Sequence, residues 1–264
     1  MEILNFRTRP VAAIALGLWA GGSALLAEQT PSRIFAARAE AAWQSAQARF
    51  QSHTNDSAAA WQFARACYDL NDFVTNNAGR ADLAIQGIVA CRHLLAMESN
   101  SAPGHYYLAI ELGQLADTKR NPAAIKMVRE IEREFKAADD LDEHLDYAGP
   151  ARCLGLLYRD APGWPLSIGS RHKARDWLES AAALAPGYPE NHLNLAETYW
   201  QWKDHEAARN ELNALDALWP AARTNFAGET WERCWDDWST RRNALREKMG
   251  ETWPAAHSSK SSRN

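Results

Sequence analysis

Apolar side chains recur every three or four residues along most of the chain, a spacing that places them on one face of a helix. The pattern is clearest over residues 189–220, PENHLNLAETYWQWKDHEAARNELNALDALWP, which we interpret as two short amphipathic helices, the second ending at Pro220. The main apolar and small positions are Leu195, Ala196, Tyr199, Ala208, Leu212 and Leu215. The small residue in each helix lets the two approach closely, so this stretch predicts a tightly packed helical hairpin.

The same order of large, small and aromatic positions returns in three upstream segments, 57–96, 102–143 and 148–186. Two positions depart from it: Arg65 stands where a small residue is expected, and Ile131 replaces the small crossing residue. The repetition resembles the tetratricopeptide repeat, whose helical hairpins stack into a curved solenoid. We therefore expect an all-α, tetratricopeptide-like helical-hairpin solenoid of about four irregular repeats, with capping helices at both ends.

The segments on either side of this repeat domain, 57–220, predict the caps. Residues 28–56 contain an Ala-rich amphipathic helix that would cover the first repeat. Residues 221–250 contain one helix, over 224–250, that would cover the apolar face of the last repeat. Its apolar stripe consists of Trp231, Trp235, Trp238, Leu245 and Met249. The polar tail, 251–264, is predicted to be disordered.

The N-terminus has the pattern of a secretory signal. An apolar stretch, VAAIALGLWAGGSALLA, follows Arg7 and Arg9 and ends in small residues. We interpret residues 1–27 as a signal peptide cleaved at Ala24 or Ala27, which predicts an exported, periplasmic bacterial protein. A retained membrane anchor is the alternative, although the stretch is short for one. No later segment is apolar and long enough to span a bilayer, so the cleaved chain is not expected to be membrane-spanning.

The charge balance and the cysteine spacing exclude some classes of function. The chain has 264 residues, with 29 Lys and Arg against 33 Asp and Glu, so it lacks the basic excess of a nucleic-acid-binding protein. None of the four cysteines forms a C-x-x-C motif of the zinc or thioredoxin type. Cys67 and Cys91 fall on partner helices of the first repeat. Either they form a disulfide, which export would permit, or they are two small buried thiols.

Catalytic and cofactor motifs are absent from the sequence. It contains neither a phosphate-binding G-x-x-x-x-G-K-[ST] loop nor a G-x-G-x-x-G dinucleotide motif. His205 and Glu206 are not followed by the second histidine of a zinc protease, and Pro165 stands where a Ser167 nucleophile elbow would need glycine. The eight histidines do not show metal-ligand spacing. We expect a protein that is not an enzyme and that uses no metal or cofactor.

Candidate binding residues follow from the repeat register, because the first helix of each hairpin lines the concave face of such a solenoid. The expected inward positions combine cations, carboxylates and aromatic rings. They include Tyr106, Arg152, Arg159, Asp160, Glu197 and Trp200. This mixture suits a peptide, or a polar ligand with an apolar part. The alternative is that Arg159 only pairs with Asp160 or Glu197 within the fold.

An insertion in the third repeat, YRDAPGWPLSIGSRHKA, places Trp164 in a loop that is rich in proline and glycine. These residues forbid a regular helix there. Two interpretations stay open: a loop that closes over the groove and lets Trp164 contact the ligand, or an Ω-like plug that packs Trp164 between helices.

The third and fourth repeats also resemble the T component (TatT-like proteins) associated with TRAP-type transporters. The matching positions are Leu154, Gly155, Tyr158, Pro162, Gly163, Trp164, Pro165, Gly169, Ala174, Leu178, Ala181, Pro186 and Tyr188. The resemblance implies a periplasmic helical solenoid that works with a transporter substrate-binding protein and handles an apolar small ligand. It implies no catalytic residues.

Two functional hypotheses follow. In the first, the chain is a non-enzymatic exported binding or scaffold protein that engages a protein or peptide partner through its concave face. In the second, it is a periplasmic carrier of an apolar small molecule, accessory to a TRAP-type transporter.

Overall fold

The computed structural model describes residues 22–119 and 122–250, with side chains described from residue 32 and, after the gap, from residue 124. The predicted disordered tail lies outside this range, as does almost all of the predicted signal peptide. The helices are α1 (Gly22–Ser52), α2 (Ser57–Asn71), α3 (Asn77–Met97), α4 (Ala102–Lys119), α5 (Pro122–Leu141), α6 (Gly149–Asp160), α7 (Arg171–Leu184), α8 (Pro189–Gln201), α9 (His205–Asn225), the short 3-10 helix η1 (Glu229–Trp231) and α10 (Glu232–Lys248). Within the described part of the chain there are no strands, and no helix has both the length and the apolar character needed to cross a membrane.

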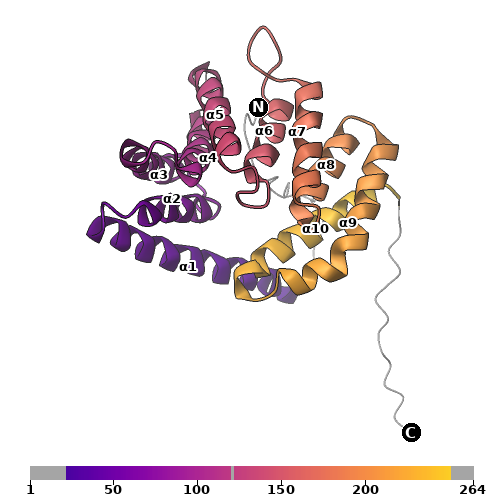
Figure 1. Cartoon of the computed structure of the whole chain (residues 1–264). Helices are drawn as coiled ribbons and strands as arrows, with labels where there is room; N and C mark the ends of the chain where they lie inside the picture. Colours follow the sequence, from indigo (N-terminus) through magenta and orange to yellow (C-terminus); the bar gives the residue numbers. More distant parts are fainter. Residues whose placement is uncertain (1–21, 120–121, 251–264) are drawn as a thin grey trace.

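The helices α2 to α9 form four successive antiparallel hairpins, which confirms the predicted helical-hairpin solenoid (Figure 1). Small residues allow the close approach within each pair. A Cβ added at Gly155 of α6 would lie 2.5 Å from Cγ of Leu178 on α7, so only glycine fits this crossing. Ala196 and Ala208 are fully buried at the α8–α9 crossing.

Hydrogen bonds at a constant spacing link two successive hairpins. Arg152 of α6 donates to Asn191 of α8 at 2.9 Å, and Arg159 donates to Thr198 at 3.1 Å; each pair is separated by 39 residues. A second pattern of hydrogen bonds recurs within two of the hairpins. His105 and His192 each bond a glutamate of their partner helix through Nδ1 and a carbonyl six residues upstream through Nε2. Successive hairpins are therefore stacked in register.

The C-terminal region differs from the single predicted helix over 224–250. Helix α9 continues through Pro220, so the expectation that this proline ends the helix is wrong. A proline inside a helix removes one backbone hydrogen bond, but the turn beyond it buries Ala222 and Phe226. The burial of this apolar turn holds the helix together past the proline. The chain then reverses at Gly228, where φ is +94°, before η1 and α10.

Both predicted caps are present. Trp43, Ala46 and Phe50 of α1 pack on the first hairpin, and the two cysteines there, Cys67 and Cys91, are buried thiols rather than a disulfide. At the other end, the last hairpin is covered by α10. The residues in this second core include Leu193, Leu212, Leu215, Trp235, Trp238 and Leu245.

The two ends of the solenoid meet, which the sequence did not predict. Arg38 of α1 lies 2.7 Å from both Glu229 and Glu232, and Arg233 of α10 forms an ion pair with Asp72 after α2. In Figure 1, α1 runs beneath the hairpins to reach α10. These ion pairs link the first and last elements and close the curved stack around a central space.

Candidate functional site on the concave face

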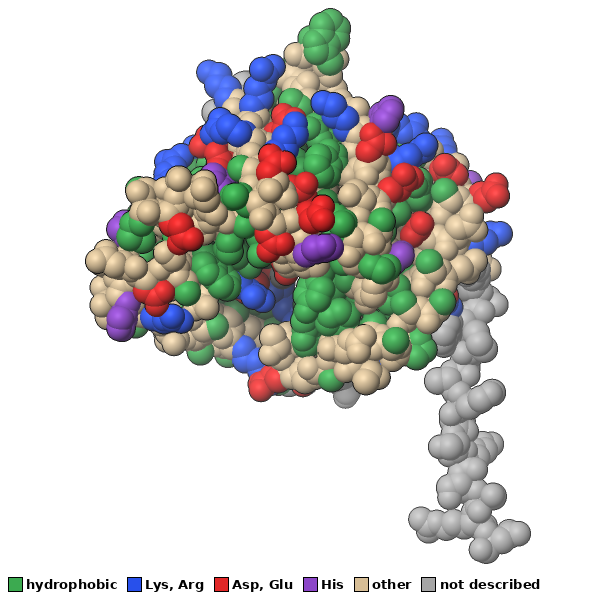
Figure 2. Space-filling model, viewed as in Figure 1, with side chains coloured by type: hydrophobic (Ala, Val, Ile, Leu, Met, Phe, Trp, Pro, Cys, Tyr) green, Lys and Arg blue, Asp and Glu red, His purple; other side chains and the backbone are tan. Residues whose placement is uncertain are grey.

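The closed stack leaves a hollow at its centre. Figure 2 shows Lys or Arg side chains in the depth of this hollow and hydrophobic side chains on its flanks. We use the name concave face for the surface formed by Trp61, Arg65, Asp69, Tyr107, Asp146 and Tyr147. These residues come from α2, from α4 and from the connection between α5 and α6, which lies near the middle of the molecule in Figure 1.

Arg65 is the accessible cation of this face. It occupies a position where the other repeats carry a small residue, so its long side chain projects beyond the helix packing. Half of the side chain, 51%, is exposed, and its Nε lies 3.7 Å from Asp69. The proximity of Tyr107, and then of Asp69 and Asp146, raises the pKa of the Arg65 guanidinium, while desolvation opposes that shift. Arg65 is thus a permanent positive charge that solvent or a ligand can reach.

Aromatic rings stand beside this charge. Trp61 stacks on Tyr107 with ring centroids 5.8 Å apart and an interplanar angle of 7°. Tyr107 is buried and supports the half-buried Trp61 from behind. A flat apolar surface with an adjacent cation suits a ligand that carries both an apolar part and a negative charge.

A strained turn forms the opposite side of the face. The backbone φ angles of Asp146, Tyr147 and Ala148 are +49°, +57° and +60°. Residues other than glycine rarely adopt this left-handed conformation. Such strain persists only where the surroundings over-determine it, and it concentrates at functional sites. Here Arg152 donates to the carbonyls of Asp146 and Tyr147, and Asn191 donates to Tyr147 at 3.1 Å.

The turn orients two side chains. The Asp146 carboxylate accepts a hydrogen bond from the Tyr106 hydroxyl at 2.8 Å and one from Arg152 at 3.2 Å. Tyr147 stacks on Tyr188 at 4.5 Å and still leaves 40% of its surface exposed. The strained backbone therefore presents an aromatic ring to solvent from a rigid base.

Two of the predicted binding residues support the site from beneath. Tyr106 and Arg152 are buried, so neither side chain is presented at the surface, and direct contact of either with a ligand stays a prediction. Tyr106 donates to Asp146, 40 residues away, and Arg152 donates to Asn191, 39 residues away, so both side chains find partners within the fold. The guanidinium of Arg152 also lies 5.3 Å from the centre of the Tyr188 ring. Both residues position the turn.

The other predicted residues have different surroundings. Arg159 pairs with Asp160 through two hydrogen bonds of 2.6 and 2.8 Å, which matches the structural alternative. Glu197 accepts two hydrogen bonds from Arg241, and Trp200 packs half-buried against His205 with 4.5 Å between ring centroids. These side chains therefore hold helices together and are not gathered around Arg65.

Trp164 fits neither earlier interpretation. Its side chain is 89% exposed, so it is not a plug between helices, and its loop projects from the end of α6 away from the hollow (Figure 1). A regular repeat joins its two helices by a short turn. In the longer connection here, Ala161 and Ile168 pack against the core at the base, and the residues between them extend outward.

Sequence reasoning missed Arg65 and Tyr147 as site residues. Arg65 carried a usable signal, since it departs from the small residue of the repeat pattern. Tyr147 carried none, because a left-handed run of three residues without glycine has no sequence signature.

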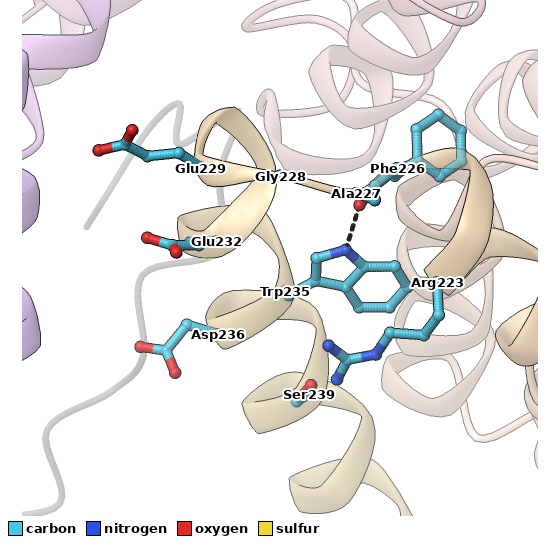
Figure 3. A pocket seen from close by; sticks show the side chains of 9 residues that line it. All are labelled: Arg223, Phe226, Ala227, Gly228, Glu229, Glu232, Trp235, Asp236 and Ser239. Carbon is cyan, nitrogen blue, oxygen red and sulfur yellow. Dashed lines mark hydrogen bonds between the residues drawn. The ribbon is translucent and has the colours of Figure 1, made fainter.

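A separate depression of about 510 Å³ lies beside α10 and is shown in Figure 3. Glu229, Glu232 and Asp236 point away from Trp235, whose indole donates to the Phe226 carbonyl at 2.6 Å. The Arg223 guanidinium lies 4.0 Å from the centre of the Trp235 ring. Glu229 and Glu232 are engaged by Arg38, so this depression, whose lining mixes Phe226 and Trp235 with charged side chains, belongs to the junction of the two chain ends.

Fold and site together define an all-α helical-hairpin repeat protein with a closed concave face. The family model described as regulator of microtubule dynamics protein 1-3 matches residues 33–148. This segment is less than half of the chain and runs from α1 to the left-handed turn, so it contains Arg65 and Tyr147. No curated protein matches the chain.

Proposed function

We propose that this protein is a non-enzymatic binding protein that holds a segment of a protein or peptide partner on its concave face. Arg65 would pair with an acidic side chain or terminal carboxylate of that segment, and Trp61 and Tyr147 would contact its apolar part. The observation that carries the proposal is the half-exposed Arg65 between an aromatic stack and a strained turn that other residues hold in place. Charge-assisted hydrogen bonds to arginine are strong and directional, so this cation would select anionic segments.

We also propose a cellular location and a partner for this protein. Export through the N-terminal apolar segment would place the protein in a bacterial periplasm, where a transporter substrate-binding protein is a suitable partner. The resemblance of the third and fourth repeats to the T component of TRAP-type transporters supports this setting. Regulation of microtubule dynamics belongs to the family matched by residues 33–148 and is not carried over to this chain.

A peptide-binding assay tests the proposal. Peptides selected on the purified protein from a random display library would be measured by fluorescence polarisation against the wild type, Arg65→Ala and Arg92→Ala. Arg92 is a suitable control because it is also exposed and also faces one carboxylate, Glu130, at 3.4 Å, but it lies on α3 outside the concave face. We expect acidic peptides with an aromatic or aliphatic residue, and a loss of about tenfold or more in affinity for Arg65→Ala alone.

The small-molecule carrier is the second candidate, because the rings of Tyr188 and Trp231 gather around Tyr147 and would also suit the apolar part of a small molecule, whose negative charge Arg65 would bind. Native mass spectrometry of the freshly purified protein separates the two. A bound small molecule that Arg65→Ala releases would favour the carrier. Equal peptide affinities for Arg65→Ala and Arg92→Ala, with no bound small molecule, would exclude both uses of this face.

A further inference from the structure

The connection between α6 and α7 is a rigid loop rather than a loose one. The backbone N–H of Gly169 donates to the Pro162 carbonyl at 2.9 Å, and the Gly163 carbonyl accepts from Leu166 and Ser167. A Cβ on Gly169 would lie 2.1 Å from the Ala161 carbonyl oxygen, so the two sides of the loop touch where only glycine fits. The loop is closed by backbone contacts at its base and needs no core at its tip.

That tip is apolar and unsupported. Trp164 is 89% exposed and Leu166 is 71% exposed, and Pro165 between them is exposed as well. In the space-filling view, hydrophobic side chains stand out from the top of the molecule (Figure 2). A large tryptophan that contacts so little of its own protein leaves its apolar surface in water, an arrangement that is favourable only when something else covers it.

Several basic side chains surround the base of the loop. Arg171, Lys173 and Arg175 are exposed on the first turns of α7, immediately after the loop. Lys136 of α5 joins them, since the ammonium groups of Lys136 and Lys173 lie 6.0 and 5.0 Å from the centre of the Tyr158 ring at the foot of the loop. Figure 2 shows Lys and Arg side chains on both sides of the apolar tip.

The basic residues face a shallow site at the start of α7. A depression of about 380 Å³ is lined by Arg171, His172, Arg175 and Asp176. The first turn of a helix also presents backbone N–H groups and a partial positive charge, which favour an anion. Carboxylates lie among these cations, since Lys136 pairs with Glu132 at 2.7 Å and Arg175 lies 3.8 Å from Asp204, so Arg171 and Lys173 contribute most to the attraction of an anion.

We propose that this loop docks the protein onto an anionic phospholipid bilayer. Trp164 and Leu166 enter the boundary between headgroups and acyl chains, where tryptophan is favoured, and the cations around the base attract the lipid phosphates. A projecting apolar tip with cations spread around it is complementary to a broad, soft, negative surface. A discrete protein pocket would instead require a defined set of polar groups beside the apolar residues. The anchoring is weak and reversible, because only two apolar side chains and a few cations take part.

Vesicle binding tests this docking with the full chain. Co-sedimentation would compare vesicles of phosphatidylcholine with vesicles containing 30% phosphatidylglycerol at low salt, a composition that we choose for its negative charge (about one lipid in three). The variants are Trp164→Ser with Leu166→Ser, and Val89→Ser as a control, because Val89 is an exposed apolar residue of α3. We expect the double variant to bind the anionic vesicles about tenfold or more weakly, and the control to bind as the wild type does.

A second measurement isolates the loop from any binding by the N-terminal apolar stretch. Brominated phosphatidylcholine in the anionic vesicles would quench the wild type more than Trp164→Phe, because only an inserted Trp164 contributes the difference. Equal quenching of these two proteins, or equal partitioning of the double variant and the wild type, would overturn the proposal. Concentration-dependent self-association that the double variant abolishes, without vesicle binding, would also overturn it and point to a second copy of the chain. Unchanged thermal unfolding of the double variant confirms that the fold is intact.

Discussion

Glu111 of α4 gives the sharpest test of how burial controls the energetics of this fold. Its side chain is fully buried, and neither carboxyl oxygen has a hydrogen-bond partner among the described residues. Gly87 of α3 leaves the space for it, since a Cβ there would lie 2.6 Å from the carboxyl carbon. Burial, and secondarily the charge of Asp69, raises the pKa of Glu111 well above its usual value. The folded protein therefore holds this carboxyl in its neutral form.

The sign of the effect on stability follows from proton binding. In the unfolded chain Glu111 ionises near its ordinary pKa of 4.5, whereas the folded protein keeps the proton to higher pH. Above that pH the unfolded state binds fewer protons than the folded state, so the free energy of unfolding falls as pH rises. The loss is about 1.4 kcal/mol for each pH unit until the folded carboxyl ionises. It amounts to at most about 3.4 kcal/mol between pH 4.5 and 7.

Replacing the carboxyl by an amide removes this pH dependence. Urea unfolding of the wild type and of Glu111→Gln would be followed by circular dichroism from pH 5 to 8, with the exposed Glu98→Gln as control. We expect the stability of Glu111→Gln relative to the wild type to rise with pH and that of the control to stay level. The test is the change of this stability difference with pH and not its size at one pH, because a buried amide without partners also shifts the stability by a constant amount. A difference between Glu111→Gln and the wild type that does not change with pH would refute the reasoning.

Further predictions concern helix contacts. Gly155→Ala should destabilise the protein by about 1–3 kcal/mol in urea unfolding, because no space exists for the Cβ, whereas Gly187→Ala, which meets no atom within 4 Å, should change stability by less than about 0.5 kcal/mol. Pro220→Ala should raise the melting temperature, since it restores the missing backbone hydrogen bond of α9, and a lower melting temperature would show that the proline is needed. Arg241→Met should lower the free energy of unfolding by about 3–5 kcal/mol at neutral pH, because it leaves the Glu190 carboxylate buried without the arginine that lies 2.8 Å from it. Burial opposes ionisation of Glu190, but Arg241 outweighs it and lowers the pKa to about 2, so the wild type should lose stability from pH 4.5 downward and Arg241→Met should lose less.

The hairpins were predictable because helix formation and close packing leave local marks in a sequence. Apolar spacing identified the buried face of each helix, and small residues such as Gly155 and Ala196 marked the crossings. The stripe of tryptophans at the C-terminus identified a cap. The boundaries of the C-terminal helices were predicted less well, because the burial of Phe226 overrides the local tendency of Pro220 to end a helix.

The sequence by itself therefore determined the fold class, the repeat register and the presence of a cap at each end. Only the tertiary structure decided which polar residues are available for binding. Arg152 and Arg159 looked like groove residues. Arg152 instead donates to Asn191 in the next hairpin, and Arg159 pairs with its neighbour Asp160 and also donates to Thr198 in the next hairpin, while Arg65 stays half exposed. A periodic pattern reports which face of a helix is buried, but the partner of a charge depends on how distant helices are stacked, and that information is not local.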